Sequence, residues 1–286
     1  MNFSCQNIKK YLLSPYGIWC RSMYELGLWK KTNLPPTQAH ISNHMESAAR
    51  QYNINHSHCH SKSVIYTCIT NQYDDINEIA TPGYINPDWD YVCFTDDKSL
   101  IEERKIGVWS IRPLAYSASD PTRNNRWHKM HPHYLFPEHN ESIYIDANVD
   151  ILTDWLFKEI KSRDCELLIP QHPTRDCIYE EYKVVFSFFL DNPSRLRAGL
   201  NAIKKSGMPK HYGLTENNVI YRRHNLEPII AIMSEWWTFI QNYSKRDQLS
   251  LAWLLWKHSI IPERISFSNP RFNPSNFCVF SHQAQR

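Results

Sequence analysis

Three oxygen-bearing side chains follow a short apolar run in the middle of the chain. Asp146, Asn148 and Asp150 come directly after residues 142–145, whose β-branched and aromatic composition predicts a buried strand. Carboxylate and amide oxygens at the carboxyl end of such a strand suit a hard divalent cation, and a cation there suits a diphosphate. The pattern therefore indicates a metal and diphosphate site, although an Asx-rich turn after a strand has the same composition.

Polar residues also follow two other predicted strands, at residues 64–70 and 88–94. The candidates there for binding a nucleotide are Thr70, Tyr73, Asp75 and Asp96. In open parallel sheets the ligand lies beyond the carboxyl ends of the strands, so these ends are expected to converge on one cleft. The Tyr73 ring could stack on a base, and the carboxylates could bind ribose hydroxyls. The alternative for each aspartate is a turn-forming role.

A basic segment precedes the strand at residues 142–145. Residues 123–131 predict a helix in which Arg123, Arg126 and Lys129 are spaced at i, i+3 and i+6. These cations could pair with a diphosphate. The alternative is a solvated basic helix face. The position of this segment, directly before the strand that is followed by Asp146, favours the functional interpretation.

The remaining pattern alternates strands with helices. The predicted strands are residues 64–70, 88–94, 108–112, 142–145, 166–170 and 219–221, and the predicted helices are residues 123–131, 153–163, 178–190, 194–206 and 249–256. Such alternation is typical of an α/β domain with a mostly parallel sheet flanked by helices.

Composition narrows the function classes. The chain has 286 residues, 42% of them hydrophobic and 21% charged, which predicts a folded protein. A net charge of +3 gives no argument for nucleic-acid binding, and only 7 glycines with no GxGxxG or GK[ST] run argue against a glycine-rich phosphate loop. The eight cysteines form no CxxC pair and no secretory or membrane-spanning segment is expected, which favours a cytoplasmic location.

Residues 1–62 read as an N-terminal helical appendage and linker, and residues 63–286 as the main domain. Residues 1–31 mix apolar and basic side chains, so this segment either packs on the domain or makes peripheral contact with an anionic membrane. Residues 56–60 contain three histidines and a cysteine; a metal site and a solvated linker are both open there.

Several short motifs occur in a fixed order. They lie at residues 66–75, 94–97, 123–129, 144–148, 172–181, 216–225 and 246–250. Together, over about residues 63–282, they resemble the glycosyltransferase-like domain family formerly of unknown function, whose relatives include plant proteins linked to mucilage pectin and one described as an alkaline ceramidase. The resemblance implies a GT-A, Rossmann-like fold that binds a nucleotide-sugar, most often a UDP-sugar, through Mn2+ or Mg2+.

The resemblance also implies a ligand set for that cation. Asp146, Asn148 and a late histidine, His282, match the positions of GT-A metal ligands, although His282 could equally be an unstructured tail residue. GT-A enzymes usually carry Asp-x-Asp, and this chain has Asp-Ala-Asn. An amide oxygen can ligate a hard cation but brings no charge, so Asp150 is a candidate to compensate.

The resemblance also implies which residues of this chain bind the acceptor and which one acts in catalysis. The acceptor candidates are His172, Arg175, Tyr179, Glu180, Glu216, Asn217, Arg222 and His224. Glu180 could instead be a first-turn acid that stabilises a helix dipole. Asp247, at the start of a predicted helix, is either a cap or the general base of an inverting enzyme, whereas a retaining enzyme would need no such base, so both stereochemistries stay open.

The expected function is a metal-dependent glycosyltransferase of hexosyltransferase type, inverting, that moves a sugar from a nucleotide-sugar to a polysaccharide or glycolipid. Surface polysaccharide biosynthesis, as for lipopolysaccharide or capsule, is the expected pathway, with no nucleic-acid partner. Two alternatives stay open. One is a non-catalytic carbohydrate-binding protein on the same fold. The other is a lipid amidase or other hydrolase, against which no GxSxG or HExxH motif is found.

Overall fold

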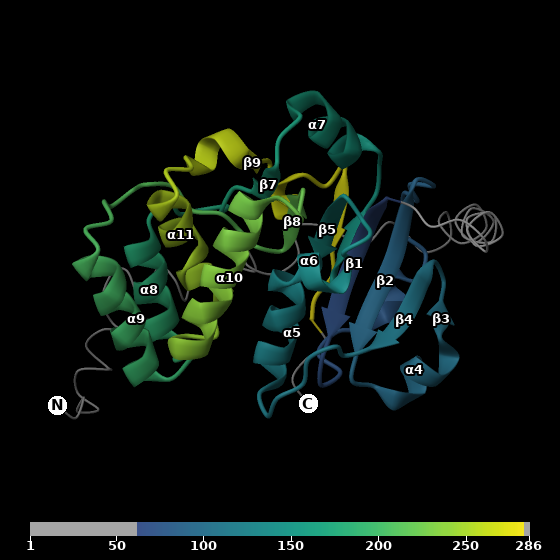
Figure 1. The fold of residues 1–286 in the computed structure, drawn as a ribbon, viewed down its shortest axis with the longest axis horizontal. Helices are drawn as coiled ribbons and strands as arrows, with labels where there is room; N and C mark the ends of the chain where they lie inside the picture. Colours follow the sequence, from purple (N-terminus) through teal and green to yellow (C-terminus); the bar gives the residue numbers. More distant parts are fainter. Residues whose placement is uncertain (1–61, 283–286) are drawn as a thin grey trace.

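A mixed, mostly parallel sheet of eight strands organises residues 62–282, the part of the chain that this computed structural model describes (Figure 1). The strand order is β3-β4-β2-β1-β5-β8-β7-β9. The strands are β1 (Ser63–Ile69), β2 (Trp89–Thr95), β3 (Lys105–Ile106), β4 (Trp109–Pro113), β5 (Glu141–Ile145), β7 (Leu167–Pro170), β8 (Val219–Arg222) and β9 (Ser266–Phe267). The predicted fold class is confirmed. The predicted appendage, the membrane contact at residues 1–31 and the cluster at residues 56–60 lie outside the described residues.

Strand β1 lies at the centre and is parallel to β2 on one side and to β5 on the other. Its side chains alternate between two cores. Ile65 and Ile69 pack with Trp109 on one face, and Tyr66 and Cys68 pack on the other face. Burial on both faces explains why this strand is apolar along its length. Strand β8 runs antiparallel to both β5 and β7, so its beginning lies at the same edge as their carboxyl ends.

Helices cover the sheet and form a separate layer beyond it (Figure 1). They are α4 (Lys98–Glu103), α5 (Pro121–Met130), α6 (Pro132–Leu135), α7 (Trp155–Arg163), α8 (Ile178–Ser187), α9 (Pro193–Lys205), α10 (Glu227–Asn242) and α11 (Leu251–Lys257), with short 3-10 turns η1 (Ile76–Ile79), η2 (Asp247–Leu249), η3 (Pro262–Ile265) and η4 (Pro270–Phe272). Helix α10 was not among the predicted helices. Its buried Ile229, Ile232, Met233, Trp236 and Ile240 follow a helical period and pack against α5 and α11. No helix in residues 62–282 is long and apolar enough to cross a membrane.

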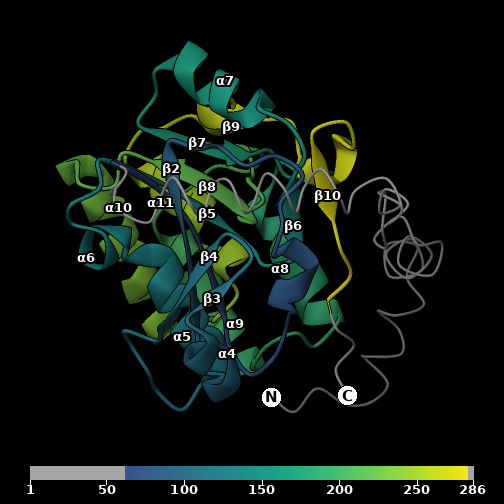
Figure 2. The same cartoon turned by 90° about the vertical axis from the view of Figure 1, so that its right-hand side faces the viewer.

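A small second sheet joins the end of the described chain to the middle. Strand β6 (Val149–Ile151) pairs antiparallel with β10 (Phe277–Val279), and Figure 2 shows the two strands side by side. The pairing is extended by Phe280, whose N–H donates to the Asn148 carbonyl at 2.8 Å. These contacts bring His282 beside the carboxyl ends of the central strands.

Candidate functional site

A cleft of about 620 Å³ lies at the edge of the sheet where β1, β5 and β7 end and β8 begins. Its walls are formed by α5, by residues 172–175, 216–218 and 245–248, by Glu181 of α8 and by His282. The volume is in the range of sites for cofactor-sized ligands. Of the residues predicted for the site, Thr70, Tyr73, Arg126, Lys129, Asp146, His172, Arg175, Glu216, Asn217, Asp247 and His282 line this cleft.

The turn after β1 supplies an aromatic platform at one end of the cleft. The rings of Tyr73 and His282 lie 4.7 Å apart, and Nδ1 of His282 is 2.7 Å from a carboxylate oxygen of Asp74. Tyr73 remains 46% exposed, so its ring is open to a planar ligand. Thr70 donates to the Pro121 carbonyl and thereby joins this turn to the start of α5.

Two aspartates predicted for nucleotide binding do not line the cleft. Both carboxylate oxygens of Asp96 accept from the Asn71 N–H, at 2.9 and 3.1 Å, so Asp96 shapes the turn that reaches the cleft. Asp75 caps η1 by accepting from the N–H of Asn77. The turn-forming alternative therefore describes the placement of both residues.

Only two of the three cations predicted on helix α5 face the cleft. The helix starts at Pro121 after Asp120, which accepts from the first free N–H groups. Arg126 and Lys129 line the cleft, but Arg123 pairs with Asp120 at 2.6 Å and donates to the carbonyl of Ile240. At 100° per residue, positions 123 and 129 are about 120° apart, so one face cannot hold both.

Two of the cleft cations converge on one carboxylate. Nζ of Lys129 is 2.7 Å from Asp247 Oδ2 and 3.4 Å from Asp146 Oδ1, and Nε of Arg126 is 3.3 Å from Asp247 Oδ2. Burial by itself would raise the pKa of Asp247, but Arg126 and Lys129 more than offset this and lower it to about 2. Asp247 is therefore charged, and it is a weak proton acceptor while both cations face it.

The three predicted metal ligands do not form one group. Asp146 and His282 line the cleft, but Asn148 is buried, and its Nδ2 donates to the Phe280 carbonyl at 2.9 Å. Within residues 62–282 no cluster of three His, Cys, Asp or Glu side chains could hold a cation. Asn148 thus fixes the segment that carries His282 and does not fit as a ligand. Asp146 and His282 fit a cation only if the ligand supplies further oxygens.

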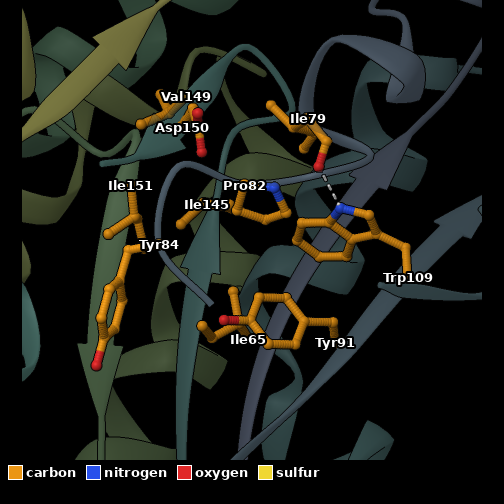
Figure 3. Close-up of a pocket in the computed structure, with 10 residues that line it drawn as sticks. All are labelled: Ile65, Ile79, Pro82, Tyr84, Tyr91, Trp109, Ile145, Val149, Asp150 and Ile151. Carbon is orange, nitrogen blue, oxygen red and sulfur yellow. Dashed lines mark hydrogen bonds between the residues drawn. The ribbon is translucent and has the colours of Figure 1, made fainter. Parts of the chain in front are cut away.

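Asp150 does not supply the negative charge that Asn148 lacks, because its carboxylate points away from the cleft. Figure 3 shows it beside a small cavity of about 10 Å³ with apolar walls, where Trp109 donates to the Ile79 carbonyl. Both oxygens of Asp150 accept from the Gly83 N–H at 3.1 Å. Burial raises the pKa of Asp150 to about 7 despite this hydrogen bond.

A buried polar wall forms the other end of the cleft. Nε of Arg175 donates to Glu181 at 2.6 Å, and His172 Nδ1 accepts from the Arg175 N–H at 3.0 Å. Burial and the charge of Arg175 lower the pKa of His172 to about 3, so this imidazole is neutral. Glu216 pairs with Arg271 at 2.9 Å. This wall presents neutral or internally paired groups.

Four residues predicted on the acceptor side lie elsewhere. The Tyr179 hydroxyl donates to the Met208 carbonyl, and Glu180 sits in the first turn of α8, while its neighbour Glu181 faces the cleft. Arg222 is fully buried on the helix-covered face of β8, where it donates to Tyr66. His224 Nε2 donates to the Phe136 carbonyl. Strand alternation explains Arg222, since it shares a face with Ile220.

The cleft also contains polar residues that were not predicted as site residues. They are Asn71, Asp74, Asp120, Asn125, Glu181, Asn218, Lys245, Arg246 and Gln248. Most are immediate neighbours of selected positions, so wider windows around the same motifs would have found them. Asp120 lies outside the motifs and carries no such signal, because its 3.3 Å contact with Lys245 joins segments far apart in the sequence.

Comparison with known protein families gives one match. The family model described as TOD1/MUCI70, glycosyltransferase-like domain, matches residues 40–273. A search of curated proteins found no match.

Solved structures also match at low identity. The apo form of mouse xyloside xylosyltransferase 1 is 11% identical with a TM-score of 0.42, over 72% of this chain and 85% of that one. The apo glycosyltransferase GlyE of Streptococcus pneumoniae TIGR4 is 8% identical with a TM-score of 0.42, over 74% of this chain and 46% of that one. The apo WbbM bifunctional glycosyltransferase is 11% identical with a TM-score of 0.43, over 73% and 39%. This chain therefore spans less than half of the latter two.

Proposed function

The chain belongs to the TOD1/MUCI70 glycosyltransferase-like domain family, and we propose that this glycosyltransferase moves a sugar from a nucleotide-sugar, most simply a UDP-sugar, to a polysaccharide or glycolipid acceptor. Surface polysaccharide biosynthesis and a cytoplasmic location, with or without contact to the inner face of the membrane, belong to this proposal through the resemblance alone.

The order of groups along the sheet edge carries the proposal. Tyr73 follows β1, Asp146 follows β5, Asn218 precedes β8 and His172 follows β7, and these four strands are neighbours in that order. With about 4.8 Å between strands, the row spans about 14 Å, the reach of a nucleotide-sugar. The cleft thus has an aromatic platform at one end, cations in the centre and a neutral polar wall at the other end. A nucleotide-sugar has its base, its diphosphate and its sugar in the same order.

The central cations suit the leaving group. Lys129 is buried and Arg126 is half-buried, and α5 fixes both, so they can stabilise charge that develops on a nucleoside diphosphate without reorganising. A divalent cation, proposed as Mn2+ or Mg2+ at Asp146 and His282, would supply further neutralisation of that diphosphate.

Asp247 is proposed as the general base, with inversion at the anomeric carbon as the matching stereochemistry and a hexose as the transferred group. Its two cation partners are the ones that a diphosphate would attract. A bound donor that draws Arg126 and Lys129 toward the diphosphate would raise the pKa of Asp247 and make it a better proton acceptor.

The direct test is titration of the purified full chain with UDP and a panel of UDP-sugars by calorimetry, followed by measurement of UDP release with and without MnCl2. We expect binding of UDP and release of UDP from at least one sugar nucleotide. Absence of nucleotide binding under all these conditions would overturn the proposal.

A non-catalytic carbohydrate-binding role is the second candidate. It is favoured by the low pKa of Asp247 and by Asn148, which is engaged with the Phe280 carbonyl. Binding of polysaccharide without turnover of any donor would support it.

A further inference from the structure

Two neighbouring amides in the cleft lack the hydrogen bonds that buried amides normally make. Asn218 is 4% exposed, and among the residues described neither its Oδ1 nor its Nδ2 has a partner. Asn217 is 3% exposed; its Oδ1 accepts from Thr215, while its Nδ2 is likewise without a partner in this part of the chain. Both residues line the cleft.

Such amides are uncommon because a desolvated donor or acceptor without a partner lowers stability. Asn124 shows how this fold treats an amide with no ligand to bind. It is also 4% exposed, but its Oδ1 accepts from the Ala118 N–H at 2.7 Å and its Nδ2 donates to the Ala118 carbonyl at 3.0 Å. The unsatisfied amides are therefore a property of the cleft wall and not of buried asparagines in this chain generally.

The position of Asn218 relative to Asp146 shows which part of the cleft these amides line. The Asn218 carbonyl accepts from the Asp146 N–H at 2.8 Å, and the next residue pair, Ile145 and Val219, is in register across β5 and β8. Asn218 thus lies one strand from Asp146 on the side of His172. In the proposed row of groups this is the position directly after the diphosphate.

We infer that Asn217 and Asn218 form the subsite for the hydroxyl groups of the transferred sugar, an inference that rests on the proposed function. An amide offers one acceptor and two donors, and a hydroxyl can both donate and accept, so the two are complementary. Arg175 and Arg271 of the adjacent wall are paired with Glu181 and Glu216, so neither guanidinium is held ready for a carboxylate on the sugar. The subsite therefore suits a neutral sugar.

Asn218→Ala separates this role from general nucleotide binding. Affinities for UDP, UDP-glucose, UDP-galactose, UDP-xylose and UDP-glucuronic acid are measured by calorimetry on wild type and variant. We expect a neutral UDP-sugar to bind wild type best, and Asn218→Ala to weaken that binding about tenfold, the effect of losing one or two hydrogen bonds, while UDP binds unchanged. Since no protein hydrogen bond is lost, the melting temperature of the ligand-free variant should not fall.

Asn124→Ala is the matched control, since it removes an equally buried amide that has partners. It should lower the melting temperature and leave the ratio of UDP-sugar to UDP affinity unchanged. An unchanged ratio in Asn218→Ala, an equal loss for UDP and UDP-sugar, or a wild-type preference for UDP-glucuronic acid would overturn the inference while the proposed function stands. If wild type binds no nucleotide, the proposed function fails and the inference fails with it.

Discussion

Nζ of Lys129 lies 2.7 Å from Oδ2 of Asp247, although the two residues are 118 positions apart in the sequence. Both side chains are buried in the cleft wall, and Arg126 adds a second cation at 3.3 Å from the same oxygen. One carboxylate thus holds the two cations that a diphosphate would also attract.

Asp247→Asn should lower the free energy of unfolding and raise the affinity for a nucleotide at the same time. Removing the carboxylate leaves the buried Lys129 and the half-buried Arg126 without their partner, which should lower the free energy of unfolding by about 3 kcal/mol. The freed cations should bind UDP more tightly, while transfer from a UDP-sugar falls because the proposed base is gone. Urea unfolding, calorimetry and UDP release measure the three effects. Asp164→Asn, which removes a pair with Arg223 at the surface, should change each of them little.

Lys129→Met should reduce UDP affinity by about ten- to a hundredfold, because a buried cation opposite the diphosphate is lost. Lys158→Met is the control: that lysine is exposed and pairs with Asp154 on α7. Equal UDP affinity of Lys129→Met and wild type, in calorimetry at low salt, would show that the diphosphate does not lie at the cationic centre.

Restoring Asp-x-Asp should not create a better metal site. In Asn148→Asp the side chain can no longer donate to the Phe280 carbonyl, and its charge would face that oxygen. We expect a lower melting temperature and no gain in Mn2+ affinity. Asp146→Asn and His282→Ala should each weaken Mn2+ binding measured in the presence of UDP. Stronger Mn2+ binding by Asn148→Asp would mean that residue 148 can reach the cation.

Asp150 should make stability fall as pH rises. Its pKa is raised from the ordinary value near 4 to about 7 in the folded protein, so between these values the folded chain retains a proton that the unfolded chain has lost. This contribution is fully present below pH 4 and is lost as pH rises through 7, with a slope of up to about 1.4 kcal/mol per pH unit. The lowered pKa values of His128, His131, His172 and His224 make stability rise with pH in wild type and variant alike, so the Asp150 contribution is read from the difference between them. In urea unfolding from pH 4.5 to 8, the stability of wild type relative to Asp150→Asn should fall as pH rises. The stability of wild type relative to the exposed Asp176→Asn should not change with pH in this way.

Local pattern was enough to predict the strands that carry the site and its edge of the sheet. Residues 64–70 and 142–145 are apolar and β-branched because β1 and β5 are buried on both faces, a requirement visible within a few residues. The polar residues after them lie in or beside the cleft because parallel strands end at one edge. Motif order likewise identified the family that the family model matches.

Only the tertiary structure decided what each polar side chain does. In the folded chain Arg123 donates to the Ile240 carbonyl outside the cleft and Asn148 donates to the Phe280 carbonyl. Lys129 pairs with Asp247. The tertiary structure also leaves the Asn218 amide without a partner among the described residues, which no local pattern reveals. The physical reason is common to all four. A side chain's charge state and hydrogen bonds depend on groups brought near by chain segments far away in sequence, whereas strand formation depends mainly on neighbours along the chain.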